Sequence, residues 1–467
     1  MPQYLSPGVY VEEVPSAIKP IAGVSTSTAG FIGVMGDSID QPLAKLTGAA
    51  IGTGDGTKTA FELPVYPVGK AHTAVKVDGT AATGVTIAND DVNKVSTATF
   101  GTAPTNGSKI TADIVPSLTP VPAGMPKLCT TFSDFKKFFG DFNGDTQHDY
   151  LAHAVYAFFN NGGSRCYVMR VASEADIPKF LLNYEAIDEV AIVAAPGLAQ
   201  NDATGKNTRT QIIAHCQVRT QNRFAIFDSP TTVESGSPAA LDLTLLDAKN
   251  ANSVLPPFTD FAAFYFPWLE VFDPITKGPI YVPPSGHVAG IYARVDNDRG
   301  VHKAPANEPV IGATGLKYAI SKAQQDGLNP EGVNCIRNLN GNLTVWGART
   351  LGGDANADLK YINVRRTLLF LRKSIEEGTQ WVVFEPNEPG LWQKITRNIT
   401  AFLTNVWRSG ALFGTTVQEA FYVKCDAETN PPELRDVGQV VAEIGVAIVR
   451  PAEFVIFRIS QFTAPSK

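Results

Sequence analysis

Cysteine is scarce in this chain of 467 residues, and long apolar runs are absent. No run approaches the ~18 apolar residues of a membrane helix, and the amino terminus "MPQYLSPGVYVEE" lacks the basic and apolar regions of a signal peptide. We therefore expect folding in a cytoplasm and no direct membrane insertion. The cysteines show no C-x-x-C spacing, which argues against a disulfide framework or a zinc site. We predict that all are small buried residues: Cys129, Cys166, Cys216, Cys335 and Cys425.

A surplus of positive charge is missing as well. The chain carries 39 Lys and Arg against 45 Asp and Glu, a formal net charge of -6. With this negative net charge we do not expect nucleic acid to bind across the whole surface of the protein. A content of 44% hydrophobic and 18% charged residues is typical of a folded protein. The length predicts about two to four domains.

The composition changes along the chain and predicts where those domains lie. Residues 1–22 contain valines among prolines and glutamates with no helical period, so we expect an extended arm with one short strand. Residues 48–122 are rich in Gly, Thr, Ala and Asp, with short runs such as "TAFELP" and "AVKVDG" between tight turns. This pattern is typical of a small all-β domain. We predict that it is inserted into an α/β domain formed by residues 23–47 and 123–312.

The remaining sequence alternates helical and strand patterns, so the predicted fold class is α/β (α+β) with several domains. A helix is expected within "DTQHDYLAHAVYAFFNNGG", capped by Asp145 or Thr146, followed by buried strands in "RCYVMRV", "EVAIVAAPG" and "NRFAIFDSP". A second α/β domain is expected over 313–450, with amphipathic helices in "YINVRRTLLFLRKSIEEG" and "LWQKITRNITAFLTNVWRSGAL". Two long strands, the last within the arm 451–467, are expected to close the chain.

Two short motifs resemble ligand sites but fit them incompletely. "GTGDGTKT" at 52–59 places Thr57 between the glycine and the lysine of a phosphate loop, so we predict a hairpin turn. "DFNGDTQHD" has calcium-loop spacing but lacks the required glycine and the bidentate glutamate, which favours helix capping. His148 and His153 are five residues apart and cannot share a metal as an i, i+4 pair would.

The stretch 278–307, "GPIYVPPSGHVAGIYARVDNDRGVHKAPAN", is the strongest candidate for catalysis. Ser285 could be a nucleophile, with His287 or His302 as base and Asp296 or Asp298 as orienter. No G-x-S-x-G elbow encloses the serine, however, and triads are normally assembled from separated loops. The alternative is an irregular connection shaped by prolines and glycines, whose polar groups satisfy its own backbone and bond a neighbour.

Five segments, taken in order, resemble the contractile tail sheath proteins of phage tails, R-type pyocins and related injection systems. They are "SPGVYVEEVPS", "FFNNGGSRCYVMRV", "VPPSGHVAGIYARVDNDRGVHKAPAN", "YINVRRTLLFLRKSIEEGTQWVVFEPNEPGLWQKI" and "AFYVKCDAETNPP". The resemblance implies a sheath subunit without enzymatic activity, cofactor or metal, which polymerises around an inner tube and contracts to drive it through a target envelope. It also implies assembly in a bacterial cytoplasm into a phage tail or an injection particle. Its implied partners are itself, the inner tube, the baseplate and a terminator or cap protein.

The resemblance and the sequence together indicate three sets of contact residues. Terminal arms with strand character can add to the sheet of a neighbouring subunit by β-augmentation, and the residues expected to do so are Val9, Tyr10, Val11, Phe454, Val455, Ile456, Phe457 and Ile459. Basic residues within a third of one helix circumference form either a solvated face or, by the resemblance, a face toward the tube: Arg365, Arg366, Arg372 and Lys373. The signature segment contributes assembly contacts through Pro283, Pro284, Ser285, Gly286, His287, Gly290, Asp296, Arg299, Gly300, Lys303 and Pro305.

Two other function classes remain open at this point. A β-module adhesin would bind glycans through the insert 48–122, which offers few aromatic residues for sugar stacking, namely Phe61, Tyr66 and Phe100. We predict instead that this insert decorates the outer surface. A serine hydrolase would use the region around Ser285.

Overall fold

The computed structural model describes residues 20–198 and 203–456. Residues 20–24 and 370–449 form one compact unit, called the small unit here. Residues 25–198, 203–369 and 450–456 form the large unit. The boundary at residue 369 falls inside helix α8 (Ile362–Gly378). No helix in these ranges is long and apolar enough to cross a membrane.

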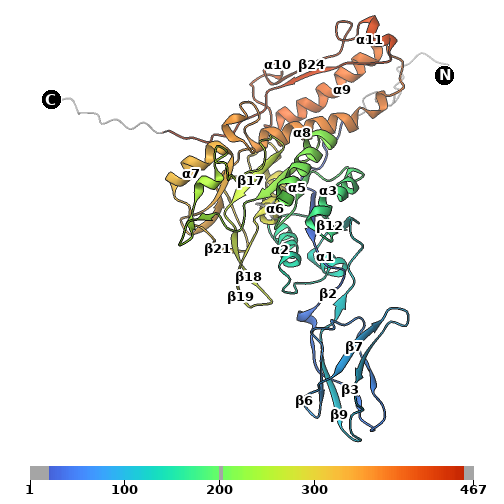
Figure 1. The fold of residues 1–467 in the computed structure, drawn as a ribbon. Coiled ribbons are helices and arrows are strands. Elements are labelled where there is room, and N and C mark those ends of the chain that lie inside the picture. The colour runs from blue at the N-terminus through green and yellow to red at the C-terminus, as the bar shows by residue number, and fades with distance from the viewer. Residues whose placement is uncertain (1–19, 199–202, 457–467) are drawn as a thin grey trace, which may run out of the picture. The chain divides into compact units, whose positions relative to one another are not determined.

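A nine-stranded sheet forms the centre of the large unit (Figure 1). The strands from β12 to β22 pair in parallel, and both edges are antiparallel. Their sequences are nearly continuous apolar runs because both faces of a parallel sheet are covered. In spatial order the strands are β11 (Lys127–Cys129), β12 (Cys166–Val171), β1 (Ala29–Val34), β13 (Ile192–Ala194), β14 (Phe224–Asp228), β17 (Ala262–Phe266), β22 (Val333–Leu339), β23 (Asn342–Val345) and β20 (Glu308–Pro309).

This sheet changes one expectation and supports others. The predicted strands "RCYVMRV", "EVAIVAAPG" and "NRFAIFDSP" are β12, β13 and β14. However, β22 and β23 lie beyond residue 313 and belong to the same sheet. The predicted end of the α/β core at residue 312 was therefore wrong, because strands later in the chain complete the sheet.

Helices cover both faces of the sheet. A Cβ added to Gly33 of β1 would meet Leu151 of α2 (Thr146–Asn160) at 2.8 Å, whereas one added to Gly30 would meet Tyr184 of α4 (Leu182–Glu185) at 3.2 Å. Residues three apart on a strand point to opposite faces, so α2 and α4 lie on opposite sides. The other helices of the unit are α1 (Phe132–Phe139), α3 (Ile177–Phe180), α5 (Ala203–Ala214) with the π-helical turn η3 (His215–Thr220), α6 (Ser285–Arg299) and α7 (Lys322–Leu328).

The capping interpretation of "DFNGDTQHD" is confirmed. The Asp145 carboxylate accepts the His148 backbone N–H at 2.9 Å and caps α2 as predicted. Asp149 accepts the N–H groups of Asn143 and Gly144, at 3.0 and 2.8 Å. Both carboxylates thus accept hydrogen bonds from backbone N–H groups. In the described parts of the chain, no three metal-ligating side chains form a cluster.

The expectation of an irregular connection over 278–307 was wrong. The segment forms strand β19 (Gly278–Val282) and then the 15-residue helix α6. Glycines make this helix possible because they let it approach α2 closely. A Cβ on Gly286 would lie 2.3 Å from the Cα of Ala154, and one on Gly290 would lie 2.5 Å from the carbonyl oxygen of Phe158. The prolines and glycines that looked like loop residues therefore begin a helix and form a helix contact.

Short elements complete the large unit. A three-stranded antiparallel sheet has the order β19, β18 and β21, and a two-residue ribbon pairs β15 with β16. Their bounds are β18 (Leu269–Asp273), β21 (Ala313–Leu316), β15 (Glu234–Ser235) and β16 (Ala240–Leu241). The 3₁₀ helices are η1 (Pro42–Ala44), η2 (Glu174–Asp176), η4 (Leu243–Leu246), η5 (Asn329–Glu331) and η6 (Gly353–Ala355).

Residues 46–114 form two small antiparallel sheets with a core of their own. Phe61 and Phe100, which are 1% and 7% exposed, pack edge to face in this core. "GTGDGTKT" is a turn in which Asp55 accepts the N–H groups of Thr57 and Lys58. It joins strands of two different sheets, so it is not the predicted hairpin. The first sheet has the order β3 (Leu46–Thr53), β9 (Lys109–Ile114), β5 (Ala74–Val77) and β6 (Thr80–Ala81). The second has the order β4 (Ala60–Leu63), β8 (Val95–Phe100) and β7 (Val85–Asp90).

A two-stranded ribbon stands at the base of these sheets. Strand β2 (Ile39–Asp40) pairs antiparallel with β10 (Ser117–Leu118), so the chain leaves and re-enters the rest of the unit at neighbouring points. The backbone N–H of Gln41 also donates to the Pro116 carbonyl at 2.8 Å. The ends of the intervening segment, residues 41–116, are thereby held together.

The small unit is built on helix α9 (Pro389–Arg408). Its buried residues recur at three- and four-residue spacing, as predicted for an amphipathic helix, and include Leu391, Ile395, Ile399, Phe402 and Val406. They pack with the hairpin of β24 (Phe421–Lys424) and β25 (Glu443–Val446). The short helices are α10 (Val417–Ala420), α11 (Pro432–Asp436) and η7 (Gln380–Val382). The expectation of a long strand near 440–451 was wrong, because β25 has four residues.

The close approach of α6 to α2 predicts that Gly286→Ala destabilises the large unit. The new methyl group would overlap the backbone of Ala154, so we expect a loss of about 1–3 kcal/mol in the free energy of unfolding. Urea titration followed by circular dichroism measures this loss. The matched control is Asn297→Ala, on the exposed side of the same helix. Equal stability of the two variants would contradict the proposed helix contact.

Candidate functional site: buried charges and the anchor of the carboxy-terminal segment

Ser285 lies in no catalytic triad. Its side chain is wholly buried (0% exposed), and its Oγ donates to Asp228 at 2.7 Å. The Ser285 backbone N–H donates to the other carboxylate oxygen, also at 2.7 Å. Asp228 ends strand β14, so a carboxylate of the sheet caps the first turn of α6. Burial raises the pKa of Asp228 to about 7, against the opposing effect of the two hydrogen bonds from Ser285.

The histidines do not serve as a base for this serine. The sequence argument placed Ser285 and His287 on a strand, where they would share a face, but on helix α6 residues two apart point in different directions. Burial lowers the pKa of His287 to about 3, and its residue is 3% exposed. The backbone carbonyl of His302 accepts a hydrogen bond from Asn363 at 2.8 Å. Ser285 and His287 are thus used for helix capping and packing, and Asp298 is exposed.

Asp296, a residue of the same hypothesis, forms a buried ion pair with Arg366. The guanidinium donates two hydrogen bonds to the carboxylate, at 2.8 and 2.6 Å, and a third to the carbonyl of Thr26 at 2.9 Å. The Thr26 hydroxyl donates to Asp296 at 2.6 Å. Both charged side chains are 4% exposed. The pair therefore joins α6, α8 and the segment before β1 within the large unit.

The other residues of the signature segment shape its helix and the following turn. Gly300 has φ 91° and ends α6, where a side chain would be strained. The ammonium of Lys303 donates to two carbonyls of the loop that follows. Arg299 is exposed. The buried prolines of the segment are Pro283, Pro284 and Pro305.

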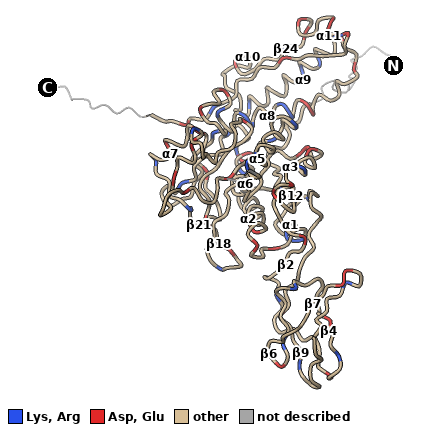
Figure 2. The backbone as a smooth tube through the Cα atoms, in the orientation of Figure 1, with Lys and Arg blue, Asp and Glu red and all other residues tan. Residues whose placement is uncertain are grey.

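The four basic residues of α8 do not form one exposed face. The guanidinium of Arg365 lies 3.5 Å from the ring centre of Phe261, Arg366 is buried as described, and Lys373 is 8% exposed. Of the four, only Arg372 is exposed. Figure 2 marks the Lys and Arg positions along the chain, those of α8 included, in blue. The predicted exposed stripe was therefore wrong for three members, because helical spacing cannot show which residues of a helix are covered in the folded protein.

The described part of the carboxy-terminal arm is apolar and open to solvent. Phe454, Val455 and Ile456 are 70%, 68% and 78% exposed. Residues 451–456 have no regular secondary structure, so the strand predicted from residue 453 does not start there. The other predicted arm residues lie outside the described ranges: Val9, Tyr10, Val11, Phe457 and Ile459.

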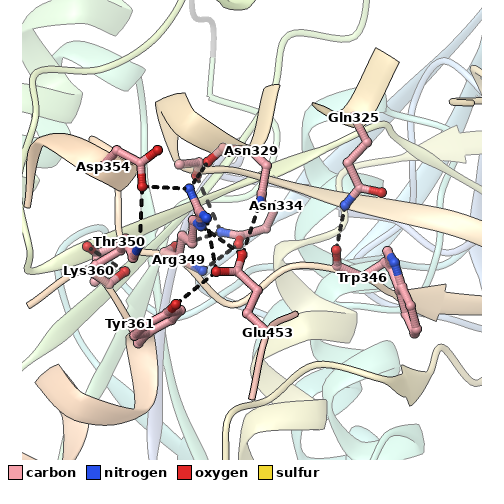
Figure 3. A network of polar contacts seen from close by, with 11 residues as sticks. Gln325, Asn329, Asn334, Trp346, Arg349, Thr350, Asp354, Lys360, Tyr361 and Glu453 are labelled. Carbon is pink, nitrogen blue, oxygen red and sulfur yellow. Dashed lines mark hydrogen bonds and ion pairs between the residues drawn. The ribbon is translucent and has the colours of Figure 1, made fainter. Parts of the chain in front are cut away.

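A buried arginine holds this arm immediately before its apolar residues (Figure 3). Arg349 follows β23 and its side chain is 4% exposed. Its Nε and Nη2 donate to the two carboxylate oxygens of Glu453 at 2.8 and 2.9 Å, which is the bidentate geometry that suits a guanidinium best. Its Nη1 donates to the Asn329 carbonyl and to Asp354, both at 3.0 Å.

Glu453 is fixed from further sides. Tyr361 donates its hydroxyl at 2.8 Å, and the side-chain amide of Asn329 donates at the same distance. Burial by itself would raise the pKa of Glu453, but the hydrogen bonds from Arg349, Asn329 and Tyr361 outweigh it and leave this pKa below its ordinary value. The carboxylate is therefore ionised at neutral pH, as the ion pair requires.

The arginine is itself positioned by the central sheet. Asn334 of β22 is 0% exposed, accepts the Arg349 backbone N–H at 2.8 Å and donates to the Arg349 carbonyl at 2.8 Å. A strand of the core thus positions the arginine, and the arginine positions Glu453. We call Arg349, Asn329, Asn334, Tyr361 and Glu453 the arm anchor. It contains no reacting group, and its geometry fixes where the carboxy-terminal arm leaves the large unit.

Arg349 and Glu453 were not among the residues singled out from the sequence. They are 104 positions apart, and neither belongs to a charged run or a known motif. One signal was available: Glu453 is the single charge between a proline and the apolar run "FVIF", where an isolated acid needs a partner once it is buried.

Comparison with known proteins gives matches to one family. The central-domain family model of phage tail sheath proteins matches residues 172–351, and the model of the phage tail sheath C-terminal domain matches residues 354–462. Together they span more than half of the chain. The tail sheath protein of Burkholderia phage BcepMu is 27% identical over 203 residues, which cover 42% of this chain and 41% of that protein.

Further relatives and solved structures agree. A putative prophage major tail sheath protein of Pseudomonas aeruginosa UCBPP-PA14 is 25% identical over 50% of this chain and 57% of its own length. The matches thus span only about half of the curated relatives. The PVC sheath of an extracellular contractile injection system, in its contracted state, has a TM-score of 0.65 at 25% identity and covers 99% of both chains. The contracted helical sheath of the anti-feeding prophage has a TM-score of 0.64 at 23% identity, covering 98% of this chain and 99% of that one.

The buried pair of Arg366 and Asp296 predicts that Arg366→Glu unfolds the large unit more easily. The change would place two carboxylates together where each side chain has 4% exposure, so we expect a loss of about 3–5 kcal/mol in the free energy of unfolding. Arg372→Glu, on the same helix but exposed, is the control and should change it by less than about 0.5 kcal/mol. Urea titration compares them. Similar losses in both variants would show that Arg366 is not buried as described.

The environment of Asp228 predicts a pH dependence. Its pKa in the folded protein, about 7, lies above the ordinary value of 3.8, so the folded state holds this proton more tightly than the unfolded state. Its contribution to stability is therefore complete below the ordinary value and is lost as the pH rises through about 7. Asp228→Asn, which cannot ionise, should avoid this loss. We expect the variant to gain on the wild type by a few kcal/mol between about pH 4 and pH 8.5, since one pKa unit corresponds to about 1.4 kcal/mol.

Thermal unfolding at several pH values measures that difference. Asp298→Asn is the control, because it removes the same charge from an exposed position of α6. A constant difference between Asp228→Asn and the wild type across this pH range would contradict a raised pKa of Asp228 in the folded protein.

Proposed function

This chain belongs to the contractile tail sheath family, and from that premise we propose that it polymerises around an inner tube and contracts to drive the tube through a target cell envelope. Related chains are sheath subunits of phages and of contractile injection systems. The observation that supports the proposal most directly is the arm anchor. Residue Glu453 is held by four hydrogen bonds, and the apolar residues directly after it are exposed.

We propose that the anchored arm joins neighbouring subunits by strand addition. Three consecutive apolar residues that are 68–78% exposed form an aggregation hazard unless a partner covers them. A fixed starting point lowers the entropic cost of docking the residues that follow. Each backbone hydrogen bond contributes only about 1 kcal/mol, but a strand shared by every pair of subunits links the whole assembly. Such links can persist while rigid units reorient.

The inner tube, the baseplate and a terminator or cap protein are the proposed partners besides the sheath itself. Arg372 is the candidate for contact with an acidic tube, because it is exposed whereas the other basic residues of α8 are engaged within their own units. Surface charge pairs are individually weak. A contact of this kind can be released during contraction.

We propose that the segment 48–122 is a surface domain that decorates the particle. The ribbon of β2 and β10 lets it leave the rest of the large unit and return at one place, and its two sheets have their own core. Glycan binding is not favoured, because Phe61 and Phe100 are core residues rather than exposed stacking surfaces. We further propose assembly in a bacterial cytoplasm into a phage tail or a phage-derived particle.

A structural role rather than serine hydrolysis fits the region of Ser285. A nucleophile must reach its substrate, and this hydroxyl is 0% exposed and donates to a carboxylate.

The arm proposal predicts the behaviour of two variants. A chain that ends at Ile456 keeps the anchor but loses the rest of the arm, so we expect the unfolding transition of the wild-type subunit and no tubes in negative-stain microscopy. The full-length variant Glu453→Gln loses the charge that neutralises Arg349. We expect a loss of about 1.5–3 kcal/mol in subunit stability and a clear decrease in tube yield.

The control is Asp298→Asn, an exposed acid of the large unit outside the anchor, which should assemble like the wild type. Tubes of normal length from the chain ending at Ile456 would disprove linkage through this arm. Cooperative unfolding lost in that chain would instead mean that residues 457–467 belong to the core of the subunit.

A further inference from the structure

A fully exposed phenylalanine stands at the tip of the loop between α8 and α9. Phe384 is 103% exposed, and its neighbour Val383 is 64% exposed. Phe384 also has φ 67°, a left-handed backbone conformation that costs free energy for a large side chain. An apolar residue that is both strained and unburied gains nothing from its own unit. Such features are typical of contact sites, where a partner covers the side chain.

Hydrogen bonds on both sides hold this tip in place. Before it, the N–H of Val382 donates to Thr379 at 2.9 Å, and the N–H of Glu385 donates back to Val382 at 3.1 Å. After it, Asn387 donates to the carbonyl of Gln439 and accepts from the indole of Trp392, both at 2.8 Å. The loop therefore presents an ordered apolar tip, followed at once by the exposed acid Glu385.

A pocket in the large unit has the complementary chemistry. It is an open surface pocket of about 400 Å³, a volume in the range of small-ligand sites. Its wall is apolar at Leu255, Pro257 and Phe258, and the ring of Phe258 is 48% exposed. Lys206 of helix α5, which is exposed, supplies its accessible positive charge, whereas Arg209 of the same helix also lines the pocket but is 1% exposed.

We propose that the tip formed by Val383, Phe384 and Glu385 docks into this pocket on a second copy of the chain. The phenyl ring would cover the apolar wall, and the carboxylate of Glu385 would face Lys206. Apolar and acidic groups adjoin on the tip, and apolar and basic groups adjoin in the pocket, so the complementarity has two independent components. The inference rests on the proposed function, because it supplies a contact between sheath subunits other than the terminal arms.

A second copy is favoured over another protein by the kind of assembly that results. The tip and the pocket are different surfaces of one chain, so their contact is heterologous. A heterologous contact leaves a free tip on one subunit and a free pocket on the other, and it therefore propagates into rings or helices. A sheath requires this type of contact.

Disulfide trapping tests the contact directly. All five native cysteines are buried, so they should not react in the folded chain. The double variant Phe384→Cys with Phe258→Cys, assembled and mildly oxidised, should give a ladder of covalent dimers and higher oligomers on a non-reducing gel. The matched control pairs Phe258→Cys with Phe413→Cys, since Phe413 is an equally apolar residue of the small unit with 72% exposure. This control and each single variant should give no ladder.

Charge exchange tests the second component. We expect Lys206→Glu to raise the concentration needed for tube formation at least tenfold, and Glu385→Lys in the same chain to restore most of the loss. Both side chains are exposed, so the unfolding transition of the subunit should not change. Failure of the rescue would contradict the pairing of Glu385 with Lys206.

The outcomes separate this inference from the proposed function. Wild-type tubes together with a ladder confirm the contact. Tubes without a ladder, a ladder of equal strength in the Phe413 control, or a disulfide within one chain would overturn it while leaving the sheath function intact. A wild-type chain that forms no tubes, alone or with an inner tube, would contradict the proposed function and this inference with it.

Discussion

A charge that is removed from water must meet its counter-charge inside the protein, and Arg349 imposes this constraint on the large unit. Its guanidinium is 4% exposed and receives Glu453 from the end of the described chain, Asp354 from η6 and a carbonyl from η5. Leaving such a group without a partner costs several kcal/mol. Residues 450–456 therefore belong to the large unit, although the chain immediately before them belongs to the small unit.

The same principle applies to the pair of Arg366 and Asp296, and it explains how polar residues are used in this chain. Arg366 of helix α8 could have been a surface contact, but it binds Asp296 of α6 and the backbone of Thr26 before β1. Glycines act in parallel, because Gly286 and Gly290 let two helices meet at backbone distance on the sheet. These buried contacts hold the large unit together, and the exposed arm extends from it.

This construction suits the proposed function, in which a subunit forms many contacts and later rearranges them. Rigid units move between two packings without unfolding, whereas short anchored segments keep neighbours linked. The anchor connects the arm to strand β22 through the hydrogen bonds of Asn334 with Arg349. The buried ion pairs of Arg349 with Glu453 and of Arg366 with Asp296 thus hold segments of the chain together.

The sequence by itself determined the fold class, the helices α2, α8 and α9, the buried strands β12 to β14 and the burial of the cysteines, because these depend on local periodicity and composition. It did not determine that residues beyond 313 complete the central sheet, that 285–299 is a helix, or that Arg366 and Lys373 are covered. Those features depend on contacts between segments tens to hundreds of residues apart. Gly286 reads as a loop residue until Ala154 lies against it, and Glu453 reads as a solvated acid until Arg349 binds it. Only the tertiary structure decided these roles, because a side chain's environment is set by neighbours in space that its neighbours in sequence do not specify.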